Sequence, residues 1–225
     1  MIRHDLESTR IIAIARGIGT EDLIPLSHAL FRGGIRLLEV TMNTPDAAEA
    51  IRELVTEWGG EQRSVLQGKS PGPPIRTGAS KDLHIGAGTV TTLALAKQAV
   101  AAGASFLVTP NVNPQVIEYA LKRRILVIPG AYLPTEITLA QELGCEYIKL
   151  FPAGSAGPEH LKHLLAPYDR TKLIAVGGVN LENARSFVEA GAFGLGVGSD
   201  LVKVPEGWDY GAVEERAREY VGVFG

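Results

Sequence analysis

Residues 147–152 read Tyr-Ile-Lys-Leu-Phe-Pro, and this stretch decides how the rest of the chain is interpreted. An extended strand alternates its two faces, so Ile148 and Leu150 share one face while Lys149 lies on the other. A lysine in the middle of an apolar strand is costly to bury as a cation, so it is either paired or its pKa falls. A lysine with a lowered pKa can attack a carbonyl and form a Schiff base. Lys149 is therefore a candidate nucleophile.

The strand belongs to a pattern that repeats along the chain. A helix ends in glycine, which tolerates the positive φ common after helices, and an apolar strand follows. This echo occurs at residues 34–37, 103–106, 144–147 and 191–194. Strands that alternate with helices favour a parallel sheet.

The alternation predicts the fold class. We expect eight strands, at residues 11–16, 37–42, 84–89, 106–110, 126–130, 147–151, 172–177 and 194–198. A helix is expected after each strand; the one after the 147–151 strand lies at residues 158–165 and the last at about residues 210–221. Eight such units predict one α/β domain, residues 1–225, with a closed (β/α)8 TIM barrel. A doubly wound open sheet is the alternative, but it usually has fewer strands, and no G-x-G-x-x-G follows the first strand.

The pattern fails from Gly59 to Asp82, where Gly, Pro, Ser, Gln and Lys dominate. The sequence Ser-Pro-Gly-Pro-Pro at residues 70–74 is incompatible with regular structure. We expect residues 59–82 to form a surface insertion that takes no part in catalysis.

Composition narrows the class of protein. The net charge is −3 and no basic run occurs, which argues against nucleic-acid binding. No stretch approaches ~20 consecutive apolar residues, so we expect no membrane span. Residues 1–10 carry charges of both signs and no apolar core of a secretory signal. The single cysteine, Cys145, excludes an intramolecular disulfide. A cytoplasmic enzyme that acts on a small molecule is the expected class.

The five histidines do not form a ligand pattern. No H-x-H occurs on a strand and no acidic cluster converges with them, so we expect neither a catalytic metal nor another cofactor. They are His4, His28, His84, His160 and His163.

In a barrel of this kind the active site lies at the C-terminal ends of the strands. Alternation groups Arg16 with Ile12 and Ile14, Glu39 with Leu37, Thr41 and Asn43, and Thr89 with Ile85 and Ala87. If these faces and that of Lys149 line the interior, the four polar groups Arg16, Glu39, Thr89 and Lys149 converge.

Two interpretations of this convergence stay open. In the first, Glu39 and Lys149 form a buried structural ion pair and Arg16 is simply solvated. In the second, Lys149 is an amine nucleophile, Glu39 shuttles protons, and Arg16 and Thr89 hold a carboxylate. Perturbed ionisable groups cluster at functional sites, which favours the second.

Glycine pairs follow the last two strands. The sequences are Val176-Gly177-Gly178-Val179 and Gly196-Val197-Gly198-Ser199-Asp200. Glycines there expose backbone N–H groups, and a short helix start can follow, which is the usual place for a phosphate in this barrel.

The order of motifs resembles a known family. Leu38-Glu39-Val40-Thr41, Gly86-Ala87-Gly88-Thr89-Val90, Val108-Thr109-Pro110, Ile128-Pro129-Gly130, Lys149-Leu150-Phe151-Pro152 and Gly177-Gly178-Val179 follow one another as in certain class I aldolases. These aldolases act on 2-keto-3-deoxy-6-phosphogluconate (KDPG), on its galactonate epimer (KDPGal) and on 4-hydroxy-2-oxoglutarate (KHG). The match covers nearly all of the chain outside residues 59–82. The resemblance implies a metal-independent lyase on a (β/α)8 barrel, commonly a homotrimer.

The resemblance also implies roles for single residues. Lys149 resembles the Schiff-base lysine, Glu39 the general acid/base, and Thr89 the residue beside the pyruvoyl carboxylate. Pro110 and Phe151 resemble the walls around the lysine. The residues that resemble the phosphate site are Gly177, Gly178, Gly198 and Ser199.

Two positions depart from the gluconate-type pattern. Asn43 stands where many gluconate-type members have arginine, and Arg16 could supply that cation from the neighbouring strand. Val176 stands where threonine often precedes the glycine pair. The segments Arg-Gly-Ile, Asn-Thr-Pro and Thr-Pro-Asn instead look like the galactonate-type branch. Asn43 and Val176 thus join the substrate-binding candidates.

Two other functions remain as alternatives. One is a phosphosugar isomerase or epimerase on the same barrel, with Glu39 as base and no covalent adduct. The other is a non-catalytic protein that binds a phosphorylated ligand.

Overall fold

The computed structural model describes residues 1–59, 83–168, 170–203 and 209–225. The expected insertion thus lies outside the described residues except for Gly59, which ends helix α3. Within the described ranges, parallel strands form one sheet in the order β5-β4-β3-β2-β1-β9-β8-β7-β6. The strands are β1 Ile11–Ala15, β2 Leu37–Thr41, β3 His84–Gly88, β4 Phe106–Val108, β5 Leu126–Ile128, β6 Gly130–Ala131, β7 Tyr147–Leu150, β8 Lys172–Val176 and β9 Gly194–Val197.

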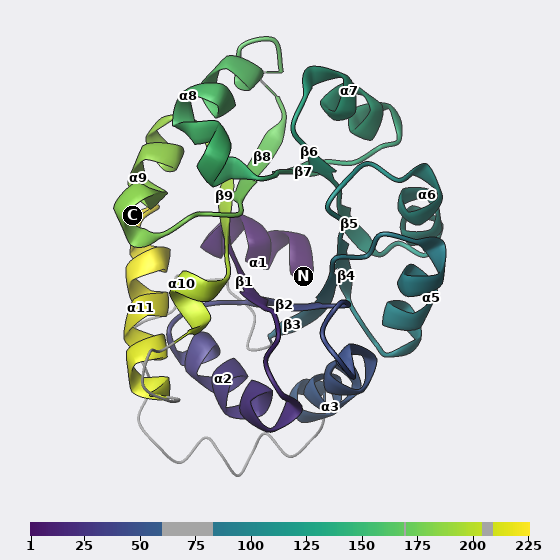
Figure 1. The fold of residues 1–225 in the computed structure, drawn as a ribbon, viewed down its shortest axis with the longest axis vertical. Helices are drawn as coiled ribbons and strands as arrows, with labels where there is room; N and C mark the ends of the chain where they lie inside the picture. Colours follow the sequence, from purple (N-terminus) through teal and green to yellow (C-terminus); the bar gives the residue numbers. More distant parts are fainter. Residues whose placement is uncertain (60–82, 169, 204–208) are drawn as a thin grey trace.

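Helices surround the sheet as a ring, and α1 lies inside this ring in the view of Figure 1. The helices are α1 Ile2–Thr9, α2 Thr20–Arg32, α3 Ala47–Gly59, α5 Leu93–Ala101, α6 Pro114–Lys122, α7 Pro134–Glu142, α8 Ala153–Leu165, α9 Leu181–Glu189, α10 Ser199–Val202 and α11 Tyr210–Gly222. None of these helices combines the length and the apolar character needed to cross a bilayer.

The sheet closes through a bend in one strand. The strand expected at residues 126–130 is divided into β5 and β6 by Pro129, which has no N–H to donate. Before the bend, Thr109 N donates to the Ile128 carbonyl at 3.2 Å; after it, Lys149 N donates to the Pro129 carbonyl at 2.8 Å. The first and last strands in the sheet order, β5 and β6, are therefore consecutive in the chain, and this connection closes the barrel. The predicted TIM barrel is confirmed, while the expected single strand is in fact two short ones.

The barrel has two apolar layers. Ile148 and Leu150 pack outward among the helix residues, as alternation predicts. A separate cluster fills the interior: Leu6, Ile12, Ile14, Leu37, Phe106, Val108, Leu126, Ile128, Tyr147, Ile174 and Val176. Lys149 and Glu39 follow Tyr147 and Leu37 by two residues, so their strands place them on this inner face.

The expected orientation of the third strand is wrong. Ile85 and Ala87 pack outward with the helices, so the inner face of β3 carries Gly86 and Gly88. A Cβ on Gly86 would lie 2.4 Å from the Phe106 ring. Glycine occurs on this inner face because the neighbouring side chains already fill the space, and apolar alternation cannot reveal that.

One helix boundary also differs. We expected the helix after β7 to begin at Pro158, but α8 begins at Ala153. Gly157 interrupts it with φ 77° and ψ 164°, so the expected helix corresponds to the part after the break. The first turn of α8 thereby stays close to the end of β7.

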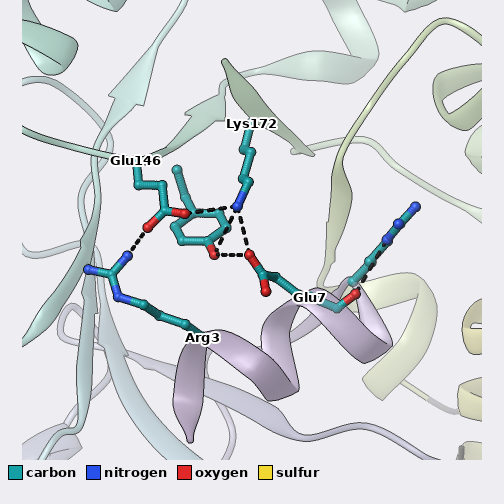
Figure 2. Close-up of polar contacts among 6 residues, drawn as sticks. Arg3, Glu7, Glu146 and Lys172 are labelled. Carbon is teal, nitrogen blue, oxygen red and sulfur yellow. Dashed lines mark hydrogen bonds and ion pairs between the residues drawn. The ribbon is translucent and has the colours of Figure 1, made fainter. Parts of the chain in front are cut away.

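Helix α1, for which the sequence predicted no element, lies across the N-terminal end of the barrel (Figure 1). Its Leu6 is fully buried in the inner cluster with Leu37 and Tyr147, the first residues of β2 and β7. Polar groups complete the contact (Figure 2). Lys172 Nζ lies 2.7 Å from Glu7 Oε1 and 2.8 Å from Glu146 Oε1, Tyr147 Oη donates to Glu7 at 3.0 Å, and Arg3 pairs with Glu146.

Candidate active site

Lys149 lies inside the barrel near the C-terminal end of β7. Its side chain is only 4% exposed, and Nζ lies 4.6 Å from the centroid of the Phe151 ring. On the neighbouring strand it is in register with Gly130, where a Cβ would lie 2.5 Å from the carbonyl carbon of Pro110. Pro110 thus lies against the neighbouring strand at Gly130, and Phe151 lies beside the lysine itself; their role as walls of the site stays a prediction.

Glu39 lies on the inner face of β2 and is 2% exposed. Its carboxylate occupies the space above Gly88 of β3, because a Cβ built there would lie 1.6 Å from Oε1. Gly88 is in register with Thr41, two residues beyond Glu39. The Glu39 carboxylate can take this position only because residue 88 has no side chain.

The two groups influence each other's charge. Burial raises the pKa of Glu39 and lowers the pKa of Lys149, and these are the largest causes of the two shifts. The Lys149 charge opposes the first shift and the Glu39 charge opposes the second. The Arg16 cation lowers both pKa values, so all three groups interact electrostatically, as the convergence of strand ends predicts.

The structure does not favour a purely structural ion pair. No contact within 4.0 Å joins the charged atoms of Glu39 and Lys149 within the described ranges. Glu39 and Lys149 are both buried, and neither forms a hydrogen bond or an ion pair within the described ranges. A buried amine and a buried carboxylate that are not paired with each other suit a chemical role better than a structural one.

Arg16 and Asn43 lie on two neighbouring segments, the loop after β1 and the turn after β2. Arg16 directly follows β1 and is exposed, and the next residue, Gly17, donates its N–H to Thr44 Oγ1 at 3.0 Å. Thr44 Oγ1 is also 3.0 Å from Thr41 Oγ1 at the end of β2. Asn43 is exposed in the turn between these threonines. The hydroxyl pair therefore fixes the Arg16 loop to the turn that carries Asn43.

Thr89 follows β3 directly and is partly buried. Its φ of 56° is in the left-handed region, which is rare and strained for a β-branched residue. Strain of this kind is common at functional sites. Thr89 lies at the end of the strand, as predicted. Because β3 ends at Gly88, however, the alternation of strand faces does not determine which way Thr89 points.

The glycine pairs lie next to each other at the ends of β8 and β9. Val176 is in register with Gly196 and is 5% exposed, inside the inner cluster. Gly177 and Gly178 both have positive φ, 88° and 77°. The Gly177 carbonyl accepts from the N–H of Gly154 at 2.6 Å, which holds the first turn of α8 against the pair.

After β9, Gly198 precedes α10 and Ser199 is exposed. The N–H groups of Leu201 and Val202 donate to the Gly198 carbonyl, whereas those of Ser199 and Asp200 donate to no backbone carbonyl of the described chain. Among the described residues, these two N–H groups beside the glycine pairs have no backbone acceptor, and the phosphate site expected there stays a prediction.

Sequence reasoning missed several residues that shape the site. Gly88 and Gly130 provide space, and Thr44 fixes a loop. A glycine inside a strand pattern is a sign of close approach and marks the first two. Thr44 gives no such sign, since its role depends on a loop 27 residues away. Among the residues with described positions, no group of three His, Cys, Asp or Glu side chains could hold a metal ion; the expectation of a metal-independent reaction stays a prediction.

Comparisons with known proteins agree with this geometry. The family model described as "KDPG and KHG aldolase" matches residues 2–61 and 75–215. A 2-dehydro-3-deoxy-phosphogluconate aldolase of Treponema pallidum is 37% identical over 184 residues, 81% of this chain and 77% of that protein. A 2-dehydro-3-deoxy-6-phosphogalactonate aldolase of Escherichia coli is 31% identical over 86% of this chain and 84% of its own length.

A solved structure from the same family also matches the chain. The KDPG aldolase of Legionella pneumophila, described with pyruvate captured as a covalent carbinolamine intermediate, superposes with a TM-score of 0.78 at 28% identity. The match covers 96% of each chain. The open-sheet alternative is excluded by this barrel, and the protein, an aldolase and hence a lyase, belongs to the KDPG and KHG aldolase family.

Proposed function

We propose that the protein is a class I aldolase that cleaves a 2-keto-3-deoxy-6-phospho sugar acid, of the gluconate or galactonate type, into pyruvate and glyceraldehyde 3-phosphate. The observation that carries the proposal is Lys149, a buried amine with a lowered pKa and no ion pair within the described chain, which shares the barrel interior with Glu39. The names of the relatives from Treponema and Escherichia coli support the substrate class, and the carbinolamine described for the Legionella enzyme supports the covalent chemistry.

The first half of the reaction forms the iminium. The neutral Lys149 amine attacks the C2 ketone and gives a carbinolamine. Glu39 moves the protons, through a water molecule, that allow the C2 hydroxyl to leave as water. Burial raises the pKa of Glu39 above its ordinary value, which helps this carboxyl to hold a proton as well as to release one.

The second half breaks the carbon–carbon bond. The Glu39 carboxylate takes the proton of the C4 hydroxyl, through a water molecule. The C3–C4 bond then breaks, and the iminium accepts the electron pair as an enamine while the aldehyde departs. Glu39 helps to protonate the enamine at C3. Water then attacks the iminium and releases pyruvate and the free Lys149 amine.

The remaining candidates hold the two ends of the substrate. Arg16, Thr89 and Asn43 bind the carboxylate end, which places its negative charge near an exposed guanidinium. The carbons between the two ends lie among Pro110, Phe151 and Val176. The phosphate is bound by backbone N–H groups around Gly177, Gly178, Gly198 and Ser199.

Substrate range is the second part of the proposal. We expect KHG to be cleaved as well, to pyruvate and glyoxylate, because the lysine chemistry needs only a 2-keto-4-hydroxy acid. Without a phosphate, KHG makes no use of the glycine pairs, so a lower kcat/KM is expected for it. Turnover of KDPG, KDPGal and KHG measured side by side gives the order of preference.

Borohydride trapping tests the mechanism. Reduction in the presence of pyruvate is expected to inactivate the enzyme and to add a pyruvate-derived mass to the peptide that contains Lys149. The Lys149→Arg variant is the matched control and takes up no mass. Full cleavage activity with Lys149 unmodified would contradict the Schiff-base mechanism. Interconversion of sugar phosphates without release of pyruvate would instead favour an isomerase or epimerase. Failure to release pyruvate from any of the three acids would favour a non-catalytic binding protein.

We also expect a homotrimer, the common assembly implied by the family. Light scattering should then give a mass of three times the 24.0 kDa chain. A mass of one or two chains would contradict it. Cytoplasmic location remains a prediction from the sequence.

A further inference from the structure

The loop after β1 carries Arg16 and is held by few contacts. Ile18 is buried and anchors the far end of the loop, whereas Arg16 and Gly17 are exposed. Among the described residues, the only hydrogen bond made by the backbone of Arg16 and Gly17 is the one from the Gly17 N–H to Thr44 Oγ1, at 3.0 Å. Between the end of β1 and Ile18, the Thr44 hydroxyl is thus the polar contact that sets the path of the backbone.

The Thr44 hydroxyl is itself held in place. Thr44 lies in the turn after β2, and its Oγ1 is 3.0 Å from Oγ1 of Thr41, which is fully buried. The Thr44 N–H donates to the Thr41 carbonyl at 2.9 Å, and the Met42 N–H donates to the Gly88 carbonyl at 2.8 Å. The turn is therefore fixed to β2 and β3, the two strands that position Glu39, and its hydroxyl fixes the neighbouring loop to the same strands.

The Arg16 guanidinium is available to an anion next to the lysine. It makes no hydrogen bond or ion pair with any described residue. Its charge nevertheless reaches the site, since it lowers the pKa of both Lys149 and Glu39. A 2-keto acid that is bound to Lys149 through its ketone carbon carries its carboxylate on the adjacent carbon. An arginine pairs with a carboxylate through two parallel hydrogen bonds of strict geometry, so a small displacement of its backbone weakens the pairing.

We propose that Thr44 is a positioning residue for the carboxylate of the substrate: its hydroxyl fixes the loop after β1 so that the Arg16 guanidinium faces a keto acid bound at Lys149. Thr44 acts through the loop and not on the reacting atoms, so its role is in the affinity for the pyruvate half of the substrate. This inference rests on the proposed role of Arg16 as a ligand of that carboxylate.

The reverse reaction tests the proposal, because pyruvate brings the carboxylate and glyceraldehyde 3-phosphate brings none. Thr44→Val removes the hydroxyl and retains the shape of the side chain. We expect KM for pyruvate to rise about fivefold, the scale of one lost hydrogen bond. KM for glyceraldehyde 3-phosphate should stay within about twofold of the wild-type value. A general loss of folded protein would lower the maximal rate and change neither KM.

Two further variants are the controls. Thr44→Ser keeps a hydroxyl at the same place and should retain the wild-type KM for pyruvate. Thr56→Val is the matched control, because Thr56 is exposed on α3 and its hydroxyl donates to the Arg52 carbonyl at 2.8 Å. The same substitution there removes one hydrogen bond that does not involve the loop after β1, so both KM values should stay at the wild-type level.

Arg16→Ala shows whether Thr44 acts through Arg16. Alone, it should raise KM for pyruvate about tenfold or more, the scale of a lost hydrogen bond to a charged group. In the Arg16→Ala protein, the addition of Thr44→Val should cause no further rise, because two changes that remove one interaction do not add. A second rise of about fivefold in the double variant would mean that the hydroxyl acts by another route, and it would overturn the proposal.

The outcomes separate this inference from the function on which it rests. If Arg16→Ala raises KM for pyruvate but Thr44→Val does not, the positioning role is wrong and the proposed function stands. If Arg16→Ala leaves this KM unchanged, Arg16 is not a ligand of the carboxylate, and the positioning role falls with it. If the wild type does not condense pyruvate with the aldehyde, the aldolase function itself is contradicted. If Thr44→Val does not fold, the pair Thr44→Ala and Thr44→Ser decides the question.

Discussion

Burial acts in opposite directions on Lys149 and Glu39. It disfavours the charged form of each, so the pKa of the amine falls while that of the carboxyl rises. The two values therefore approach each other, and transfer of a proton between the two groups costs less than it would in water. Two such groups titrate as a pair, so a pH profile of the reaction reports the pair rather than either residue.

Glu39→Gln tests the proton shuttle at this scale. The amide retains the shape of the side chain but can neither accept nor donate the proton, so kcat should fall by roughly 10²–10⁴, the usual scale for a positioned acid/base. The melting temperature should not fall, because the variant removes a buried charge that has no ion pair in the described chain. Steady-state kinetics and thermal unfolding measure the two effects. A rate near that of the wild type would remove Glu39 from the mechanism.

At the scale of elements, the inner face of β3 shows how one strand makes room for a functional group on the next. Phe106 of β4 fills the space above Gly86, and Glu39 of β2 fills the space above Gly88. The two glycines stand in the same strand and on the same face, but one borders an apolar ring and the other a carboxylate. A side chain added at Gly86 should therefore disturb packing, whereas one added at Gly88 should disturb the Glu39 carboxylate.

Gly88→Ala should reduce activity far more than stability explains. The added methyl would lie 1.6 Å from Glu39 Oε1 and 2.3 Å from Cδ, so the carboxylate must leave its position. We expect kcat to fall by about 10² or more, toward the loss of the shuttle itself. Gly86→Ala is the control on the same strand: its methyl meets the Phe106 ring at 2.4 Å, which lowers the melting temperature as overpacking does but leaves the carboxylate in place. A folded Gly88→Ala enzyme with wild-type kcat would refute this role of the glycine.

Much of this arrangement could be predicted from the sequence, for identifiable reasons. Strands such as Tyr147–Leu150 are short apolar runs between glycine and proline, and the order of strands follows from the right-handed connections of parallel sheets. The inner positions of Lys149 and Glu39 follow from alternation. Alternation failed at β3, because Gly86 and Gly88 carry no hydrophobic signal. No local pattern indicated α1 either, because only two apolar residues of this helix, Ile2 and Leu6, pack against the barrel interior.

Contacts between distant residues could not be predicted in this way. Thr44 and Gly17 are 27 residues apart, and Glu7 and Lys172 are 165 apart. These residues lie in turns, on a helix or at a strand start, and no local pattern distinguishes them from solvated ones. Only the closure of the whole barrel brings them together, so the fine adjustment of the site lies beyond the reach of motif reasoning.

At the scale of the whole molecule, helix α1 at the N-terminus contacts Tyr147, the first residue of the strand that carries Lys149. Glu7 accepts hydrogen bonds from Lys172 and Tyr147, and in that order these bonds lower its pKa from an ordinary value of 4.5. A lowered pKa in the folded protein means that the ionised carboxylate stabilises the fold. This contribution is complete above the unfolded pKa and disappears as pH falls through the folded one.

Glu7→Gln should therefore lower the melting temperature at pH 7, and the deficit should shrink as pH falls below about 4.5. Because the network is partly exposed, the deficit at pH 7 should be small, roughly 1–3 °C for a chain of this size. Lys172, whose pKa the same pairs raise, loses its share only at strongly alkaline pH. Thermal unfolding of both proteins from pH 3 to 9 measures the difference at each pH.

Glu53→Gln is the control for this prediction. Glu53 is an exposed carboxylate on α3 that makes no ion pair with any described residue, so its loss removes a charge without removing a contact. Its melting temperature should stay parallel to that of the wild type at every pH. If the Glu7→Gln deficit were the same at pH 3 as at pH 7, the stabilising contact would not depend on the Glu7 charge. The docking of α1 would then have to be assigned to its other contacts, among them Leu6 in the inner cluster and the Arg3–Glu146 pair.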